Sequence, residues 1–277
     1  MKLHSGIPSI NMYQDLLDSE LFLEMERYAD SFLKEYDFLK DHYSWVKDPF
    51  HQWSRQWEYP FIFNCINEYL EDNQNTLVLD AGAGITFSPY LLSELSGVSQ
   101  VVCQDIDPLL GTLYSRVNKQ YKYTSPALSI GQLQNLQFNS DTFDIVYSIS
   151  VLEHTDNYRE IVKEFHRVIK KDGILVLTFD IGLDGVSDIS PDKAQELLEF
   201  LCQYFQCEDD LAEKITKIIS NSKDMLVTSR KIEKNQNNLL PWKHPFLSLI
   251  KSAFKNFSVP VKLSKDLTFY CAVFIKK

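Results

Sequence analysis

The sequence predicts an α/β fold built on a mostly parallel, doubly wound sheet. Short apolar segments, bounded by turn residues and partly β-branched, recur along the chain and have the pattern of buried strands. Between them, apolar residues recur three and four positions apart, which is the spacing of an amphipathic helix. Such alternation favours a sheet with helices on both faces. The expected strands are 76–80, 99–105, 127–130, 144–149 and 174–179.

Two features are expected to complete the sheet. The helix that follows the fourth strand is expected to carry Lys170 and Lys171 near its negative C-terminal end and to end at Gly173. Further on, apolar segments at 259–263 and 267–275 predict an antiparallel pair that closes the sheet.

The chain divides into two expected domains. Residues 1–72 predict a helical N-terminal cap, because apolar side chains recur at helical spacing through 12–40. Residues 73–277 hold the sheet, with an insertion at 182–243 that departs from the alternation. The cap either packs on the sheet domain or covers a substrate, and the two are compatible. The insertion is a candidate substrate lid or an ordinary surface elaboration.

Composition limits the classes of partner. The chain has 277 residues, 44% of them hydrophobic, which is enough for a packed core. Its net charge is −10, which argues against nucleic acid or an anionic membrane as partner. No apolar segment approaches the length of a membrane span. We expect a small-molecule partner, and the oligomeric state stays open.

The cysteines indicate a reducing compartment. There are five, scattered along the chain without a Cys-x-x-Cys pair, and buried reduced thiols are the expected state. Residues 1–6 lack the apolar stretch of a signal peptide. Together these observations predict a cytoplasmic location.

A glycine-rich turn follows the first expected strand. Asp80 ends the strand, and Gly82 and Gly84 allow a sharp turn and close approach of the backbone to a ligand. A dinucleotide fingerprint requires a third glycine where Phe87 lies, and a phosphate-binding loop requires a lysine that is absent. The turn therefore predicts a small-molecule site at the carboxyl end of a strand.

The same stretch resembles motif I of the class I S-adenosylmethionine (SAM) methyltransferases. Asp80, Gly82 and Gly84 match that motif, and Thr86 replaces its last glycine. Downstream, residues 140–154 resemble the family's segment in which a buried strand leads into Leu-Glu-His. The resemblance covers about residues 75–180 and implies a Rossmann-like methyltransferase sheet with SAM as the cofactor.

The resemblance also implies which residues bind the cofactor. Asp105 ends the second expected strand and would accept hydrogen bonds from both ribose hydroxyls, with Asp107 as the rival for this role. Gln132 replaces the family's usual acid beside adenine, and its side-chain carbonyl can still accept from the adenine amino group. The cofactor-binding set is Asp80, Ala81, Gly82, Gly84, Asp105, Ile106, Gln132, Leu133 and Ser148.

Methyl transfer to a hydroxyl gains from a general base, typically a histidine or a carboxylate with a tuned pKa. His154, beside the expected pocket, is the first candidate; the alternative is a histidine at a helix start that hydrogen-bonds the backbone. His51 and His244 are the next candidates. No metal-ligand constellation is visible, so no metal is expected.

Aromatic side chains that also carry polar groups either contact the substrate or pack the helical cap onto the core. The substrate candidates are Trp53, Arg55, Trp57 and Tyr59.

We therefore expect a SAM-dependent methyltransferase that acts on the oxygen or nitrogen of a small molecule, a metabolite or a sugar-like acceptor. The alternative is a SAM-binding partner subunit without catalysis, because the pattern departs from the family at Thr86 and Gln132. A nicotinamide-dependent reductase is a third reading, disfavoured by Phe87.

Overall fold

The computed structural model describes most of the chain. His244 and the expected segment 259–263 lie outside the described residues, as does most of the expected insertion. The described residues are 2–42, 48–183, 189–207, 215, 219, 224–228 and 266–277.

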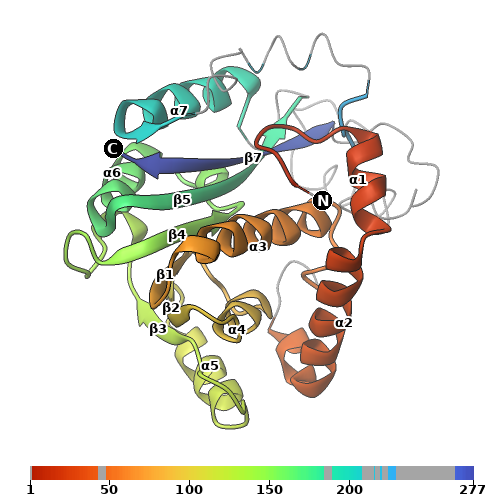
Figure 1. Cartoon of the computed structure of the whole chain (residues 1–277), viewed down its shortest axis with the longest axis vertical. Helices are drawn as coiled ribbons and strands as arrows, with labels where there is room; N and C mark the ends of the chain where they lie inside the picture. The colour runs from red at the N-terminus through yellow and green to blue at the C-terminus, as the bar shows by residue number, and fades with distance from the viewer. Residues whose placement is uncertain are drawn as a thin grey trace, which may run out of the picture.

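The described residues form one sheet of seven strands in the order β3-β2-β1-β4-β5-β7-β6 (Figure 1). The pairs from β3 through β5 are parallel, and β7 is antiparallel to both its neighbours. The predicted doubly wound sheet with an antiparallel closing strand is thereby confirmed. The strands are β1 (Thr76–Ala81), β2 (Val98–Asp105), β3 (Ala127–Ile130), β4 (Phe143–Ile149), β5 (Ile169–Gly182), β6 (Phe205–Gln206) and β7 (Leu267–Lys276).

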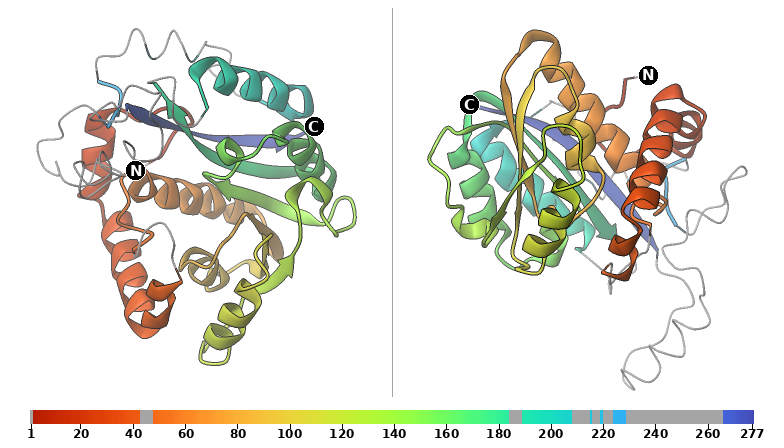
Figure 2. Two further views of the ribbon diagram at one scale, coloured as in Figure 1. Left: turned by 180° about the vertical axis from the view of Figure 1, so that it is seen from behind. Right: turned by 90° about the horizontal axis from the view of Figure 1, so that it is seen from below.

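Helices cover both faces of this sheet (Figure 2). The apolar side chains of successive strand residues point to opposite faces, so each central strand supplies two cores. On β1, Val78 packs in the core that the N-terminal helices cover, and Leu79 packs in the core beneath α6 and α7. The helices between strands are α4 (Ser88–Ser93), α5 (Leu110–Asn118), α6 (Tyr158–Val168) and α7 (Pro191–Tyr204), with the short turns η2 (Leu133–Asn135) and η3 (Leu152–His154).

The N-terminal region is helical, as its periodicity predicts, but in four pieces. Ser19 interrupts the expected single helix, because its hydroxyl accepts from the amide of Phe22 and so caps a new helix. The pieces are α1 (Ile10–Leu17), α2 (Glu20–Glu35), η1 (Asp37–Asp41) and α3 (Arg55–Asp72).

The N-terminal helices share a hydrophobic core with the sheet. Leu16 of α1, Phe32 of α2 and Ile66 of α3 belong to the same buried cluster as Val78 of β1. α3 crosses the face formed by β4, β5 and β7. The expected boundary at residue 72 lies at the end of α3, and the residues on its two sides share one hydrophobic core. The assignment of 1–72 as a cap stays a prediction.

The first part of the expected insertion completes the sheet. α7 begins at a capping serine, Ser190, whose hydroxyl accepts from the amide of Lys193. Its apolar face packs on the sheet, and the chain then returns as β6, which pairs with β7. The role of the rest of 182–243 as a lid stays a prediction.

The expected helix end at Gly173 is wrong. α6 stops at Val168, and Lys170 already lies in β5, where its ammonium nitrogen is 2.8 Å from each carboxylate oxygen of Asp144. Gly173 passes so close to β4 that a Cβ there would lie 2.6 Å from the carbonyl oxygen of Asp144. Glycine is needed at this position for strand contact rather than for ending a helix.

The expectation of reduced thiols throughout is also wrong. Cys202 and Cys207 form a disulfide, because the reversal from α7 into β6 brings their Cα atoms to 5.6 Å, within the usual range. Cys65, Cys103 and Cys271 are buried and free. Since disulfides are rare in reducing compartments, the cytoplasmic location stays a prediction. Among the described residues, every helix is too short or too polar to cross a membrane.

Candidate cofactor and acceptor site

The carboxyl ends of β1, β2, β3 and β4 meet at one edge of the sheet, which is where doubly wound folds bind ligands. The glycine turn leaves β1 and lies over the end of β2. The amides of Gly82 and Ala83 donate to the carbonyl of Gln104, at 2.8 and 3.1 Å. The turn is thereby fixed to the strand that carries Asp105.

Gly82 has a φ of +82° and Gly84 a φ of +53°, conformations that residues with a Cβ rarely adopt. A Cβ on Gly82 would lie 2.5 Å from a methyl carbon of Val151, whereas one on Gly84 would meet nothing within 4 Å. Gly82 is therefore required by backbone conformation and packing, whereas Gly84 is required by backbone conformation alone and has open space beside it.

Asp105 holds the glycine turn with one carboxylate oxygen and its own loop with the other. Its Oδ2 accepts from the Gly84 amide at 2.8 Å, and its Oδ1 accepts from the Asp107 amide at 3.0 Å. A carboxylate offers about four acceptor positions, so two remain for the hydroxyls of a ribose. Asp107 instead accepts from the Leu109 amide at 2.9 Å, as a turn residue before α5 does.

Asp80 is buried at the end of β1. Its Oδ2 accepts from the Tyr147 hydroxyl at 2.7 Å. Burial, with the nearby charge of Asp105, raises the pKa of Asp80 to about 7, while the Tyr147 hydrogen bond opposes this. Asp80 thus exchanges its proton near neutral pH beside the glycine turn.

Ala81 and Ser148 form a cross-strand contact, and their contact with a cofactor stays a prediction. The Ser148 hydroxyl donates to the carbonyl of Ala81 at 2.7 Å, and both side chains are buried. This contact fixes the ends of β1 and β4 relative to each other.

The residues expected to meet adenine follow β2 and β3. The Gly131 amide donates to the carbonyl of Asp105 at 2.8 Å, which brings Gln132 and Leu133 next to the Asp105 loop. Gln132 is exposed, Leu133 is buried, and Ile106 is 65% exposed. An apolar side chain so exposed beside polar groups is available to a flat, partly apolar ring such as adenine.

The structure reveals Gln104 as a further residue of this region. Its side chain is buried, and within the described residues neither polar atom has a hydrogen-bond partner. A Cβ on Gly131 would lie 2.9 Å from the side-chain amide nitrogen of Gln104. Gln104 precedes the strand-ending acid, so its position was visible in the sequence, but its burial was not.

A charged group covers the carboxyl end of β4. Arg55, in the first turn of α3, donates to the carboxylate of Glu58 and to the hydroxyl of Ser150. Ser150 in turn donates to Glu58 Oε1 at 2.7 Å. Arg55 thus lies at the carboxyl end of β4, and its contact with a substrate stays a prediction. Glu58 and Ser150 were not predicted.

Glu153 extends this group on the β5 side. Its Oε1 accepts from the Asp180 amide at 3.1 Å, and the residue is only 8% exposed. Burial and the charge of Glu58 raise the pKa of Glu153 to about 8, against the opposing effect of Arg55 and backbone amides. Within the described residues, its Oε2 has no hydrogen-bond partner.

The other three substrate candidates pack as core rings. Trp53 meets Phe269 edge-to-face with ring centres 5.2 Å apart, and Trp57 stacks on Tyr13. Tyr59 packs on Phe87 at 4.8 Å. These contacts fit the packing alternative, and substrate contact by these rings stays a prediction.

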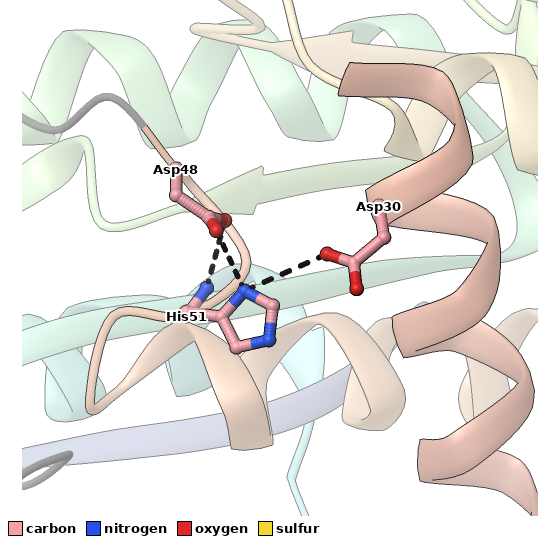
Figure 3. A group of neighbouring side chains, drawn as sticks. All are labelled: Asp30, Asp48 and His51. Carbon is pink, nitrogen blue, oxygen red and sulfur yellow. Dashed lines mark hydrogen bonds and ion pairs between the residues drawn. The ribbon is translucent and has the colours of Figure 1, made fainter. Parts of the chain in front are cut away.

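The two described histidine candidates occupy different places. His154 lies in η3, and its backbone amide donates to the carbonyl of Val151 at 3.0 Å. His51 lies in the loop before α3, near Asp48 of the same loop and Asp30 of α2 (Figure 3). Its Nδ1 is 2.7 Å from Asp48, and its Nε2 is 3.0 Å from Glu26 of α2. Asp48 and Glu26 raise the pKa of His51 to about 9, so it is cationic near neutral pH and unsuited to accept a proton.

Asp30 completes the group around His51. Ligand atoms of Asp30, Asp48 and His51 lie within 4.8 Å of one another, a spacing at which a metal ion could be held. The protonated imidazole already supplies a positive charge between these carboxylates. The geometry is thus accounted for as an ion-pair group that joins α2 to the loop before α3.

Residues 79–177 match the family described as methyltransferase domain. This part of the chain is therefore similar to methyltransferase domains. The matched residues span β1 to β5 and include the glycine turn, Asp105 and Glu153.

The similar proteins are distant. The malonyl-[acyl-carrier protein] O-methyltransferase of Laribacter hongkongensis is 29% identical over 128 residues, 43% of this chain and 39% of that protein. The chain thus aligns with about two-fifths of that relative's length. The [4+2]-cyclase SpnF matches with TM-score 0.54 and 13% identity over 99% of both chains. The YcgJ protein of Bacillus subtilis matches with TM-score 0.49 and 16% identity, over 77% of this chain and 97% of that one.

Proposed function

We propose that the protein is a SAM-dependent methyltransferase that acts on the oxygen or nitrogen of a small-molecule acceptor. The observation that carries this proposal is the pairing of Gly84 with Asp105. A glycine turn with open space on one side is held by a carboxylate that keeps two acceptor positions for a ribose. The methyltransferase-domain match over the same residues supports SAM as the nucleoside ligand.

The cofactor residues have separate roles in this proposal. Asp105 accepts from the ribose hydroxyls, and Gln132 with Ile106 meets adenine. The turn at Gly82 and Gly84 lies against the methionine part, next to Asp80. SAM supplies a methyl group on a sulfonium, which is a good leaving group. The chain's task is then to align the acceptor and exclude water.

The acceptor is proposed to be a small molecule rather than nucleic acid or a membrane surface. The net charge of −10 supports this choice. The relative from Laribacter hongkongensis is named as an O-methyltransferase of malonyl-[acyl-carrier protein], which supports methyl transfer as the reaction class. The oligomeric state stays open.

A SAM-binding protein without methyl transfer is the second candidate. The similarity in fold to a [4+2]-cyclase supports this candidate, because that protein is named for a reaction other than methyl transfer. Incubation with SAM carrying a tritiated methyl group and a panel of small alcohols and amines separates the two. Tritiated product with stoichiometric release of S-adenosylhomocysteine (SAH) is expected; binding of SAH without transfer to any acceptor would favour the second candidate.

A further inference from the structure

Arg55, Glu58, Glu153 and Asp180 form a group at the carboxyl ends of β4 and β5, which we call the acid cluster. Its members come from α3, η3 and β5. In the sheet order, the adenosine end of the proposed site lies over β3 and β2, and the glycine turn follows β1. The acid cluster therefore lies beyond β1 on the opposite side, where an acceptor must approach the methyl group.

The acid cluster carries more acid than base. Glu58, Glu153 and Asp180 are three carboxyl groups, and Arg55 is one guanidinium. Arg55 is engaged by Glu58 and by Ser150 of the β4 end. An acceptor that brought its own carboxylate would add negative charge here and would have to displace Glu58 from Arg55, which is costly for buried ions.

Glu153 has one carboxylate oxygen bonded and one unbonded. Oε1 accepts from the Asp180 amide, and Oε2 has no partner among the described residues although the side chain is more than nine-tenths buried. An unsatisfied buried polar atom costs about 1–3 kcal/mol, so one at a ligand-binding edge is explained when a ligand supplies the partner.

Building on the proposed function, we propose that the acceptor is an amine and that Glu153 Oε2 receives the proton that its nitrogen loses. Nitrogen becomes positively charged as the methyl group is transferred, and the surplus of acid stabilises that charge. An aliphatic hydroxyl is a much weaker acid than a methylated ammonium, and a phenolate or carboxylate acceptor would bring negative charge to the acid cluster.

The nitrogen lone pair forms a bond to the methyl carbon, and the carbon–sulfur bond breaks with its electron pair moving to sulfur. The sulfonium becomes the neutral thioether of SAH. The nitrogen, now carrying four bonds, releases one proton to the ionised Glu153 carboxylate, which becomes the neutral acid. Burial raises the pKa of Glu153 to about 8, so this carboxyl can accept and return a proton near neutral pH.

The test uses the full chain and begins with SAH binding by calorimetry. Absence of SAH binding by the folded chain would contradict the proposed function itself, independently of the role of Glu153. Methyl transfer from tritiated SAM is then measured for primary and secondary amines, among them 2-phenylethylamine. Each amine is paired with the alcohol and the carboxylic acid of the same skeleton, here 2-phenylethanol and phenylacetate. Label is expected in the amines alone.

Variants then test Glu153 on the amine that is methylated fastest. Glu153→Gln is expected to lower kcat about a hundredfold or more with little change in KM, and to abolish a rise in rate up to about pH 8. Glu153→Asp should restore part of kcat. Glu160→Gln, an exposed acid on α6, is the matched control and should behave as wild type.

Three results would overturn the assignment. Transfer to alcohols or carboxylic acids in preference to amines would refute the acceptor class. An unchanged kcat and pH profile in folded Glu153→Gln would refute its role. SAH binding by a protein that methylates no amine of the panel would refute both.

Discussion

The backbone amide of Gly84 donates a 2.8 Å hydrogen bond to Oδ2 of Asp105, across 21 positions of sequence. This contact connects the glycine turn after β1 to the acid that ends β2. Asp105 therefore shapes the turn, and in the proposed function it also accepts from the ribose. Loss of its carboxylate is therefore expected to loosen the turn at the same time as it removes the ribose contacts.

Gly82→Ala is expected to destabilise the fold and weaken cofactor binding. The left-handed conformation costs a residue with a Cβ about 1–2 kcal/mol, and the contact with Val151 adds about 1–3 kcal/mol of overpacking. Denaturant unfolding measures the sum. Gly111→Ala is the control: Gly111 lies in α5, and a Cβ there meets nothing. That variant should be neutral or slightly more stable, and equal stability of the two variants would contradict the geometry.

Asp80 gives stability a defined pH dependence. Its pKa is raised from 3.8 to about 7 in the folded protein, chiefly by burial. The folded state thus favours the protonated form, so this contribution to stability is full below about pH 4 and is lost as the pH rises through 7. Asp80→Asn removes the titration and can still accept from Tyr147.

The free energy of unfolding of Asp80→Asn relative to wild type should therefore increase between pH 5 and pH 8. Thermal unfolding at closely spaced pH values measures this difference. A difference that stays constant over this range would show that Asp80 is ionised throughout.

Arg55→Met should destabilise more than the double variant Arg55→Met with Glu58→Leu. The single change leaves the Glu58 carboxylate buried without its cation, a loss of about 3–5 kcal/mol, whereas removing both charges is often near neutral. A double-mutant cycle measured by urea unfolding gives the coupling free energy between Arg55 and Glu58. Equal losses in the single and double variants would mean that water already screens the pair.

The Cys202–Cys207 disulfide should add stability under oxidising conditions. Closing this short loop is expected to contribute about 2 kcal/mol by restricting the unfolded chain. Comparison of wild type with and without reductant measures it, and Cys202→Ser with Cys207→Ser should remove the difference. A reductant effect that persists in this double variant would assign it to another cause.

The sequence predicted the parts of the site that depend on local pattern. The apolar strands, the glycine turn and the acid that ends β2 are all visible within a few residues, and the structure confirms the sheet that they imply. The strands end at one edge because they are parallel, so Asp80 and Asp105 could be placed together without the structure.

The acid cluster could not be predicted in this way. Arg55 contacts Ser150 across 95 positions of sequence, which depends on how α3 crosses the sheet. Glu153 is one residue from His154, and only the structure shows that the acid is buried and the histidine exposed. Similarly, the helix end at Gly173 was misplaced because a glycine required by strand contact looks the same in sequence as one that ends a helix.

The most direct test of the account is calorimetric titration of SAH into wild type, Asp105→Ala and Asp107→Ala. Asp105→Ala loses two charge-assisted hydrogen bonds of about 1.5–3 kcal/mol each, so affinity should fall on the order of a hundredfold or more. Asp107→Ala loses only a turn contact and should bind as wild type does. Absence of binding by folded wild type, or loss of binding in Asp107→Ala but not in Asp105→Ala, would contradict the account.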